Sequence, residues 1–309
     1  MFQCCWFIWE DKKFHVKHIT NSPITNSELK PFLTCKDYTV SGEFFTILKD
    51  EKSGLLVTSP RPEDKDLGHF YESEDYISHT DAKASFTEKL YQIVRKYTLK
   101  RKLRLIDSFQ QEEKSLLDIG CGTGDFLHYC KQHGWKVDGV EPNSKAKKIT
   151  EEKVGLHLKG RIEEINAQYD VITMWHVLEH VPNLLEYIAK LKLLLKENGV
   201  LIVAVPNHKS YDATYYKEWW AAYDVPRHLW HFSKKSISVL FGKAEMKIEK
   251  IVPMYFDSFY VSLLSEKYKT GSSNFIKAFF IGLLSNLKAI STKEYSSLIY
   301  IIKNSKNSF

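Results

Sequence analysis

Cysteine is scarce in this sequence. Five cysteines are spread over 309 residues: Cys4, Cys5, Cys35, Cys121 and Cys130. They form no evenly spaced set, which excludes the disulfide framework of a small secreted fold. The simplest interpretation is that the thiols are reduced and that the protein is cytoplasmic.

Segments that would enter a membrane or a secretion pathway are also lacking. Residues 1–10 carry no basic residue, and Asp11 follows too early for a secretory signal. The apolar run at residues 278–287 contains Gly282 and Ser285 and is too short to span a bilayer. We therefore expect a soluble protein without a transmembrane segment.

Charge of one sign is not concentrated anywhere. The 44 basic and 38 acidic residues are mixed along the chain, and the net charge of +6 is modest. Such a balance fits an anionic partner and an ordinary soluble surface equally well. The sequence has no internal repeat, and its length suits one large domain with additions or two domains.

One glycine-rich stretch organises the rest of the chain. An apolar run from Ser115 to Ile119 is followed by three glycines at alternate positions, Gly120, Gly122 and Gly124. Apolar residues then return at helical spacing. This order predicts a buried strand, a tight turn and a helix. Glycine suits the turn because it accepts positive φ and lets a ligand approach the backbone.

A second predicted strand ends in a carboxylate. Residues 135–141 have a strand-like pattern that ends at Glu141, about twenty residues after the first glycine. At that spacing an acidic side chain binds ribose hydroxyls in nucleotide-binding α/β folds. The spacing G-x-G-x-G after Asp118 nevertheless differs from the dinucleotide fingerprint G-x-G-x-x-G.

Together these residues resemble the class I S-adenosylmethionine-dependent methyltransferases. Residues 118–124 resemble motif I of that family, and Glu141-Pro142-Asn143 resembles its acidic second motif. Residues 169–180 resemble the fourth strand and its following turn, and residues 198–207 resemble the fifth strand. The four motifs stand in the family's order.

The resemblance implies an α/β fold with a doubly wound, mostly parallel, seven-stranded Rossmann-like sheet. The alternation of strands and helices also predicts parallel strands with helices on both faces. Five strands are expected to end at these positions: Gly120, Glu141, near Lys159, Trp175 and Val205. Residues 246–255 and 297–302 are expected to form the last two strands, and the final one would be antiparallel. Helical insertions are expected at residues 207–245 and 256–292.

Residues 1–66 are interpreted as a separate module. Strand-like runs at residues 44–48 and 55–58 predict a hairpin. The frame resembles the N-terminal zinc ribbon of many such methyltransferases, but its four ligand positions hold other residues: Ser22, Thr25, Asp50 and Ser53. Zinc needs thiolates or imidazoles. We therefore predict a degenerate ribbon that holds no metal and keeps a packing role.

Residues 67–112 are expected to link this module to a methyltransferase domain at residues 113–309. Tyr76 and His79 belong either to plain packing or to a lid, since related enzymes cover the cofactor with an N-terminal tyrosine-rich segment. Residues 83–108 have apolar side chains at every third or fourth position, which predicts a long helix. We expect its basic side chains on a solvated face.

The resemblance also assigns cofactor-binding residues, and the cofactor would be S-adenosylmethionine. Ligands of open α/β sheets bind beyond the carboxyl ends of the strands. Asp118 would face the methionine half of the cofactor together with the turn, and Glu141 would bind the ribose. The turn consists of Gly120, Cys121, Gly122, Thr123 and Gly124.

Further cofactor contacts are implied by the segments after the next strands. Pro142, Ile162 and Glu163 would flank the adenine. Trp175 and His176, at the end of the fourth strand, would face the cofactor. A core position is the alternative for Trp175.

Glu179 and His180 follow the fourth strand, where O-methyltransferases of quinone pathways carry a similar L-E-H. Those enzymes have an additional acidic residue before the pair, whereas this chain has Trp175-His176 there. The difference argues against transferring their metal or their quinone acceptor to this chain. Glu179 could equally favour the first turn of a helix. His180 is kept as a candidate catalytic residue.

The acceptor side is predicted at residues 219–233. This stretch resembles the W-x-x-Y-D-x-P-R-H-x-x-H-F-S segment that follows the fifth strand in one methyltransferase branch. A buried core would explain its aromatic residues but not the polar residues among them. His228 or His231 could accept the acceptor's proton, with Asp224 orienting the base. Arg227 could bind an anionic group.

Residues 274–290 predict an apolar helix. Phe275 and Phe279 belong to one stripe, and Ile276 and Phe280 belong to the next. Such a helix normally buries its stripe against the domain. The alternative is a substrate lid or a peripheral membrane contact for a lipid-linked acceptor.

Two functions of different classes remain. The first is methyl transfer from S-adenosylmethionine to a small-molecule, glycan or lipid-linked acceptor, at oxygen. The second is a catalytically inactive, cofactor-binding interaction protein of the same fold. A nucleic-acid partner is not expected, because there is no N-P-P-Y-type tetrad after the fourth strand and no dense basic stripe. The sequence leaves the oligomeric state open.

Overall fold

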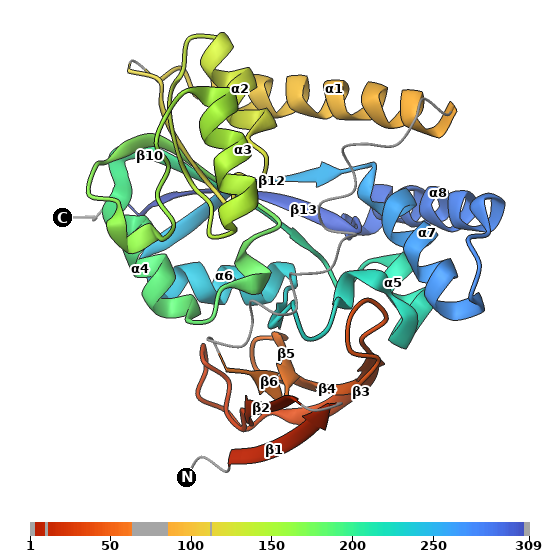
Figure 1. Ribbon diagram of the computed structural model, residues 1–309. Helices are drawn as coiled ribbons and strands as arrows, with labels where there is room; N and C mark the ends of the chain where they lie inside the picture. The colour runs from red at the N-terminus through yellow and green to blue at the C-terminus, as the bar shows by residue number, and fades with distance from the viewer. Residues whose placement is uncertain (1–3, 10–11, 64–85, 112, 306–309) are drawn as a thin grey trace.

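A computed structural model of the chain describes residues 4–9, 12–63, 86–111 and 113–305. Its centre is a six-stranded mixed sheet in the order β12-β13-β10-β9-β7-β8. The strands are β7 (Ser115–Ile119), β8 (Lys136–Val140), β9 (Tyr169–Trp175), β10 (Leu195–Pro206), β12 (Met246–Met254) and β13 (Ser297–Asn304). Figure 1 shows this sheet between two groups of helices.

The strand directions confirm the predicted α/β fold. β7, β8, β9 and β10 are parallel, and β13 is antiparallel between β10 and β12. The expected third strand is only a single bridge between Lys159 and Val140, so the sheet has six strands where seven were predicted. The chain turns at Gly160 and enters the short helix η4 (Ile162–Glu164), which leaves no length for a ladder.

Helices cover both faces of the sheet, as Figure 1 shows. One face carries α1 (Phe86–Asp107), α2 (Asp125–Gln132) and α3 (Ser144–Val154), and the other carries α4 (Leu184–Leu194) and α6 (Lys234–Lys243). Neighbouring residues of β7 point to opposite faces. Leu116 belongs to the core with Leu103 and Cys130, whereas Leu117 belongs to the core with Leu191.

Two helical insertions follow β10 and β12, as the sequence predicts. The first contains α5 (Tyr211–Tyr216) and the short helices η6 (Lys217–Trp219) and η7 (Ala221–Tyr223). The second is a pair of packed helices, α7 (Asp257–Thr270) and α8 (Phe275–Thr292). Both insertions lie on the side of the molecule to which the carboxyl ends of the parallel strands point.

The N-terminal segment forms two small sheets. One contains β1 (Cys4–Trp9), β2 (Lys12–Lys17) and β6 (Arg61–Pro62). The other has the order β11-β5-β4-β3, with β3 (Lys30–Lys36), β4 (Phe44–Lys49), β5 (Leu56–Ser59) and β11 (Trp230–His231). The predicted hairpin is confirmed as β4 and β5. The fourth strand, β11, comes from the loop after β10 and joins the two parts of the chain.

The buried side chains described in the N-terminal segment pack against the rest of the chain. Ile24 and Val57 lie in the same buried cluster as Leu117 and Ile172 of the central sheet. The side chain of Arg61 also donates a hydrogen bond to the carbonyl of Pro182 at 3.1 Å. The segment and the methyltransferase-like part therefore share a buried apolar cluster.

The four positions that resemble zinc ligands come together around one carboxylate. Asp50 Oδ2 accepts hydrogen bonds from the hydroxyls of Ser22 and Thr25, each at 2.7 Å, and a short one from Ser53. Ser27 donates to the other oxygen at 2.8 Å. Burial alone would raise the pKa of Asp50, but the four hydroxyls outweigh it and hold the pKa well below its usual value.

Candidate functional site at the carboxyl edge of the sheet

The glycine turn after β7 adopts the left-handed conformation three times. The φ angle is +67° at Gly120, +56° at Gly122 and +76° at Gly124. A Cβ at Gly120 would overlap Val177, and one at Gly124 would overlap Thr150, so both glycines allow close packing. Among the described residues, no atom lies within 4 Å of a Cβ built at Gly122. In that part of the structure the backbone of Gly122 therefore faces open space, as a ligand-binding turn requires.

Glu141 follows β8 and lies beside this turn. Its Oε2 accepts a hydrogen bond from the Gly122 N–H at 2.8 Å, and its Oε1 accepts one from the Asn143 N–H at 2.9 Å. The side chain is buried, which raises the pKa of the carboxyl against the effect of these two bonds. A carboxylate has about four acceptor positions, so two remain for hydroxyl donors.

Asp118 lies in β7, buried below the turn. Its Oδ1 accepts a hydrogen bond from the Thr173 hydroxyl at 2.6 Å. Burial raises the pKa of Asp118 to about 7, although the Thr173 bond and the nearby Lys102 ammonium act against it. A second cation beside this carboxyl would favour its charged form.

Lys102 of α1 is a residue of this site that the sequence analysis missed. Its Nζ lies 4.0 Å from the centre of the Trp175 ring and 5.6 Å from that of Phe126. Burial lowers its pKa to about 8, while Asp118 and Asp257 oppose the shift. The expectation of a solvated face is therefore wrong for this lysine. Its position in the sequence was a clue, because a residue four places further on, on the same face of the helix, is buried.

The remaining predicted cofactor contacts divide into three cases. Pro142 and Glu163 are exposed, and Ile162 is buried in the core near Val140. The Glu141 N–H donates to the Lys159 carbonyl at 3.0 Å, which brings the segment containing Ile162 close to Glu141. Tyr76 and His79 lie outside the described residues, so the lid stays a prediction.

His176 follows β9 with an unusual backbone, at φ +57°. Its Nδ1 lies 3.3 Å from Glu179 Oε1, and its Nε2 lies 3.1 Å from Asp257 Oδ2. Burial would lower the pKa of His176, but the two carboxylates outweigh it and raise the pKa to about 10. The ring is therefore a cation at neutral pH that joins η5 (Leu178–His180) to α7.

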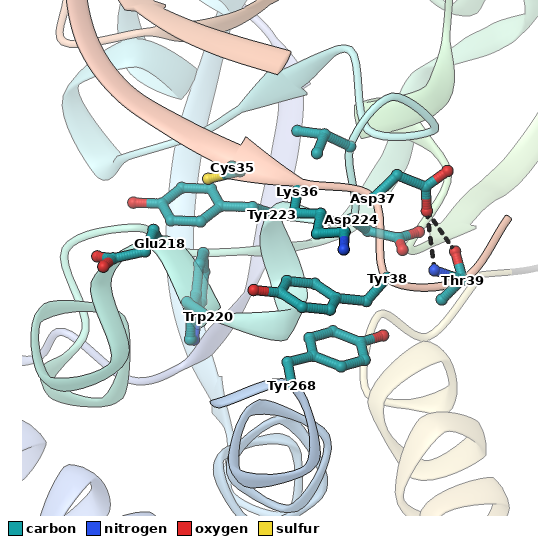
Figure 2. Close-up of a pocket in the computed structure, with 11 residues that line it drawn as sticks. Cys35, Lys36, Asp37, Tyr38, Thr39, Glu218, Trp220, Tyr223, Asp224 and Tyr268 are labelled. Atoms are coloured by element: carbon teal, nitrogen blue, oxygen red, sulfur yellow. Dashed lines mark hydrogen bonds between the residues drawn. The ribbon is translucent and has the colours of Figure 1, made fainter. Parts of the chain in front are cut away.

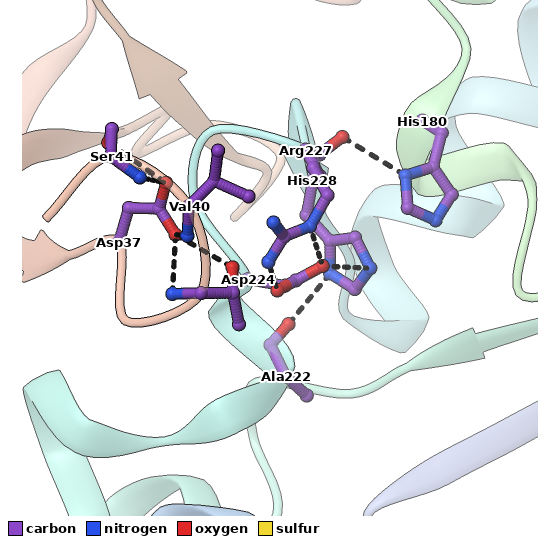
Figure 3. A network of polar contacts seen from close by, with 9 residues as sticks. Asp37, Val40, Ser41, His180, Ala222, Asp224, Arg227 and His228 are labelled. Carbon is purple, nitrogen blue, oxygen red and sulfur yellow. Dashed lines mark hydrogen bonds and ion pairs between the residues drawn. The ribbon is translucent and has the colours of Figure 1, made fainter. Parts of the chain in front are cut away.

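Glu179, His180 and His228 form a polar cluster, and their possible ligand atoms all lie within 4.8 Å of one another. The two rings are oriented by backbone carbonyls: His180 Nδ1 pairs with Arg227 O at 3.0 Å, and His228 Nδ1 pairs with Ala222 O at 2.9 Å (Figure 3). A carbonyl only accepts, so Nδ1 carries the proton in both rings. Burial, then the charge of His228, lowers the pKa of His180 to about 4.

Glu179 has no solvent-exposed surface, and among the described residues neither of its oxygens accepts a hydrogen bond of good geometry. Two imidazoles and one carboxylate are a donor set that divalent transition metals accept. From the sequence no metal is predicted, and that stays a prediction.

Asp224 connects this cluster to Arg227. Arg227 Nε donates to Asp224 Oδ2 at 2.9 Å, and Arg227 Nη2 makes a short contact with the other oxygen. The same Asp224 Oδ2 lies 3.9 Å from His228 Nε2 (Figure 3). The structure thus brings three of the predicted acceptor-side residues together, with the aspartate between arginine and histidine.

A shallow hollow opens on the other side of Asp224 (Figure 2). The N-terminal segment forms one wall with residues 35–39, and the first insertion forms another with Glu218, Trp220 and Tyr223. Tyr38 stacks on Tyr268 of α7, with ring centres 4.5 Å apart. The sequence did not reveal this hollow because its walls come from three distant segments.

His231 is placed differently from His228. It lies in β11, is buried, and its Nε2 is 3.0 Å from the Thr58 hydroxyl of β5. Burial lowers the pKa of His231 well below its ordinary value. Its ring therefore lies in the contact between the loop and the N-terminal segment. A role for His231 as the general base stays a prediction, and this position does not favour it.

Comparison with known proteins decides the family. A family model for a methyltransferase domain matches residues 91–251, which is more than half of the chain. The chain belongs to the S-adenosylmethionine-dependent methyltransferases. Magnesium protoporphyrin IX methyltransferase from Synechocystis, solved with bound SAH, is similar in fold, with a TM-score of 0.53, 16% identity and coverage of 78% of this chain and 100% of that one.

Curated relatives of this methyltransferase are O-methyltransferases of ubiquinone biosynthesis. The protein from Rhodopseudomonas palustris is 32% identical over 115 residues, covering 32% of this chain and 46% of the relative. That from Actinobacillus pleuropneumoniae is 36% identical over 109 residues, covering 30% and 46%. The chain thus spans about half the length of these relatives.

The residues at the carboxyl edge fit the cofactor of this family. Gly122 leaves open space, Glu141 keeps acceptor positions for hydroxyl groups, and the Asp118 carboxyl can pair with an ammonium. Trp175 Nε1 is buried and has no hydrogen-bond partner among the described residues, which leaves a donor at the same edge. These features together agree with the cofactor site that the sequence predicts.

Proposed function

We propose that this protein transfers the methyl group of S-adenosylmethionine to an oxygen of a small-molecule, glycan or lipid-linked acceptor. The observation that carries the proposal is the orientation of His228. Its Nδ1–H is occupied by the Ala222 carbonyl, so its other nitrogen, Nε2, is the one able to accept a proton. The base lies in a polar cluster beyond the end of β9, next to the predicted cofactor edge.

When bound, the cofactor would supply an electrophilic methyl group on a sulfonium, whose carbon–sulfur bond breaks on transfer and leaves a neutral thioether. Glu141 would hold ribose hydroxyls, and the turn at Gly122 would let the cofactor approach the backbone. Asp118 would pair with the ammonium of the methionine half. These contacts would orient the donor for transfer of its methyl group.

On the acceptor side, His228 Nε2 would take the hydroxyl proton as the oxygen forms its bond to the methyl group. The resulting imidazolium would be stabilised by Asp224, whose carboxylate is 3.9 Å away. Arg227 holds that carboxylate in place through two contacts. A hydroxyl acceptor is also in keeping with the curated relatives, which are named as O-methyltransferases.

The first experiment identifies the acceptor. Purified protein and cofactor labelled in its methyl group are incubated with extracts of the source cell, and the labelled product is identified. Methylation at oxygen supports the proposal. An absence of labelled product from all extracts, with the cofactor bound, supports an inactive binding protein instead.

The second experiment tests His228. His228→Ala should lower the rate of product formation by about a hundredfold, the scale of a lost acid–base contribution, and leave cofactor affinity unchanged. His157→Ala is the matched control, because the His157 side chain is 81% exposed. If His228→Ala abolishes cofactor binding or unfolds the protein, the histidine is structural and the proposed base is wrong.

A further inference from the structure

Helix α8 exposes an unusually large apolar face. Seven large side chains on this helix are 40% to 73% exposed: Phe275, Ile276, Phe279, Phe280, Leu284, Leu287 and Ile290. At 100° per residue they cover about half of the helix circumference. A soluble monomer normally leaves such a face uncovered only where something binds to it.

The opposite face of α8 is fixed against the protein by small residues. Ala278, Gly282 and Ala289 are buried, and a Cβ at Gly282 would lie 2.8 Å from the Phe259 ring of α7. The Ser285 hydroxyl donates to Asp212 at 2.6 Å. A side chain at Gly282 would clash with α7, and the small residues keep the two helices close, so the packing directs the larger apolar arc outward. The expectation that the stripe would be buried is wrong.

Electric charge around the helix is positive. Residues 257–293 contain five lysines and two acidic residues. Both acids are already paired, because Asp257 contacts His176 and Glu266 contacts Lys277. The remaining lysines therefore give the hairpin an excess of positive charge. A second copy of the same face would bring like charges together, whereas an anionic surface would neutralise them.

We propose that the hairpin of α7 and α8 docks this protein on an anionic lipid bilayer, with α8 lying in the headgroup region. Apolar side chains along one side of a helix, with lysines near them, are the pattern of an interfacial helix. By length and composition α8 is also the one helix among the described residues that could cross a membrane. Its 18 residues span only ~27 Å, and its small-residue face is held by α7, so it lies on the bilayer.

The apolar surface continues onto neighbouring elements. Phe256 and Tyr260 at the start of α7 are 40% and 54% exposed, and Tyr97 of α1 is 52% exposed. Tyr97 contacts Phe256 edge to face, with ring centres 5.6 Å apart. In Figure 1 the hairpin and one end of α1 lie on the same side of the molecule, so a planar surface could reach both.

The docking hairpin is joined directly to the polar site. Asp257, the first residue of α7, contacts His176, and His176 contacts Glu179 of the cluster that contains His228. This step rests on the proposed function: a lipid-linked acceptor would leave the bilayer beside the residues that are to methylate it. The proposal thereby selects the lipid-linked class among the possible acceptors.

Co-sedimentation with vesicles tests the docking surface. The full chain should bind vesicles of phosphatidylcholine mixed with phosphatidylglycerol, and should bind pure phosphatidylcholine at least tenfold more weakly. Ile276→Ser with Phe280→Ser should reduce binding to the anionic vesicles at least tenfold, since two exposed apolar side chains no longer enter the bilayer. The matched control is Leu185→Ser with Leu193→Ser, exposed leucines of α4 on the opposite side of the molecule.

Each outcome decides the proposal. Equal vesicle binding by the α8 variant and the unaltered protein would overturn it, as would no binding to anionic vesicles. A dimer that dissociates in the α8 variant would show instead that the face joins two copies. Cofactor affinity and methylation of a soluble acceptor are measured in parallel. Vesicle binding without methylation would contradict only the proposed function. Methylation without vesicle binding would contradict only the proposed docking surface.

Discussion

Glu141 combines two tasks at a single residue. It accepts N–H groups from Gly122 and Asn143, which holds the glycine turn against the end of β8. We predict that its remaining acceptor positions bind the ribose hydroxyls of the cofactor. A carboxylate suits both tasks because each of its two oxygens accepts hydrogen bonds and neither carries a proton.

Glu141→Gln should therefore weaken S-adenosylmethionine binding by roughly ten- to a hundredfold, the range for a hydrogen bond to a charged group. The amide NH2 of glutamine would also face N–H donors. Titration calorimetry measures the change, and Glu152→Gln, at an exposed position of α3, is the control. An unchanged affinity would mean that the ribose is bound elsewhere.

Asp118 gives the cofactor-free protein a pH-dependent stability. Its carboxyl has a pKa near 3.8 when unfolded and about 7 when folded, so the folded state holds the proton more tightly. The contribution of this group to stability is therefore present at low pH and falls as the pH rises from about 4 to about 7. Above that range the folded protein must bury a charge.

Asp118→Asn should remove this dependence. The free energy of unfolding of the variant, relative to the unaltered protein, should rise by roughly 2 kcal/mol between pH 5 and pH 8. Denaturant titrations at both pH values give the difference, in which the other titrating groups largely cancel. A constant difference would show that the Asp118 pKa is not raised.

At the scale of elements, the turns of the N-terminal sheets meet at one buried carboxylate. The turn before β3 and the turn between β4 and β5 meet at Asp50, where four hydroxyls donate to one carboxylate. A zinc ribbon joins two such turns through thiolates. Here hydrogen bonds join them, which is why hydroxyl residues suit the positions that resemble zinc ligands.

Asp50→Ala should lower the free energy of unfolding by about 2 to 4 kcal/mol, because it leaves two buried and two half-buried hydroxyls without their acceptor. Glu51→Gln changes the neighbouring exposed carboxylate and should have little effect. Denaturant unfolding compares the two variants, and elemental analysis of the unaltered protein should find no stoichiometric zinc. One zinc ion per chain would contradict the metal-free interpretation.

At the scale of the whole molecule, the N-terminal segment and the central sheet share a buried cluster. Ile24 and Leu55 of the N-terminal segment lie in the buried cluster of the central sheet, and β11 pairs with β5. The His208 ring also lies 3.1 Å from the Gly54 carbonyl. Surfaces that bury one another in this way are expected to unfold together.

Calorimetry should accordingly show a single transition for the full chain. Leu55→Ala should lower the midpoint of that one transition, with a loss of about 2 to 5 kcal/mol, because Leu55 has no exposed surface. Phe44→Ala is the control in the same segment, since Phe44 is 62% exposed. Two separate transitions, with only the smaller one shifted by Leu55→Ala, would show that the segment folds alone.

Local patterns in the sequence determined the central sheet and placed the turn and the carboxylates of the predicted cofactor site. The strand before Gly120, the turn, and the strand before Glu141 each follow from a few neighbouring residues. Their relative positions then follow from parallel pairing, which brings the carboxyl ends of strands to one edge. The hairpin of β4 and β5 and both helical insertions were predictable for the same reason.

Tertiary packing decided which side chains are buried and which partners they contact, and local patterns in the sequence do not contain that information. The pattern of one helix does not show that Lys102 reaches Trp175, or that small residues direct the apolar arc of α8 outward. It also does not distinguish His228, oriented by Ala222, from His231, enclosed beside Thr58. In each case the deciding neighbour comes from another element, and burial and hydrogen bonding depend on that neighbour rather than on spacing along the chain.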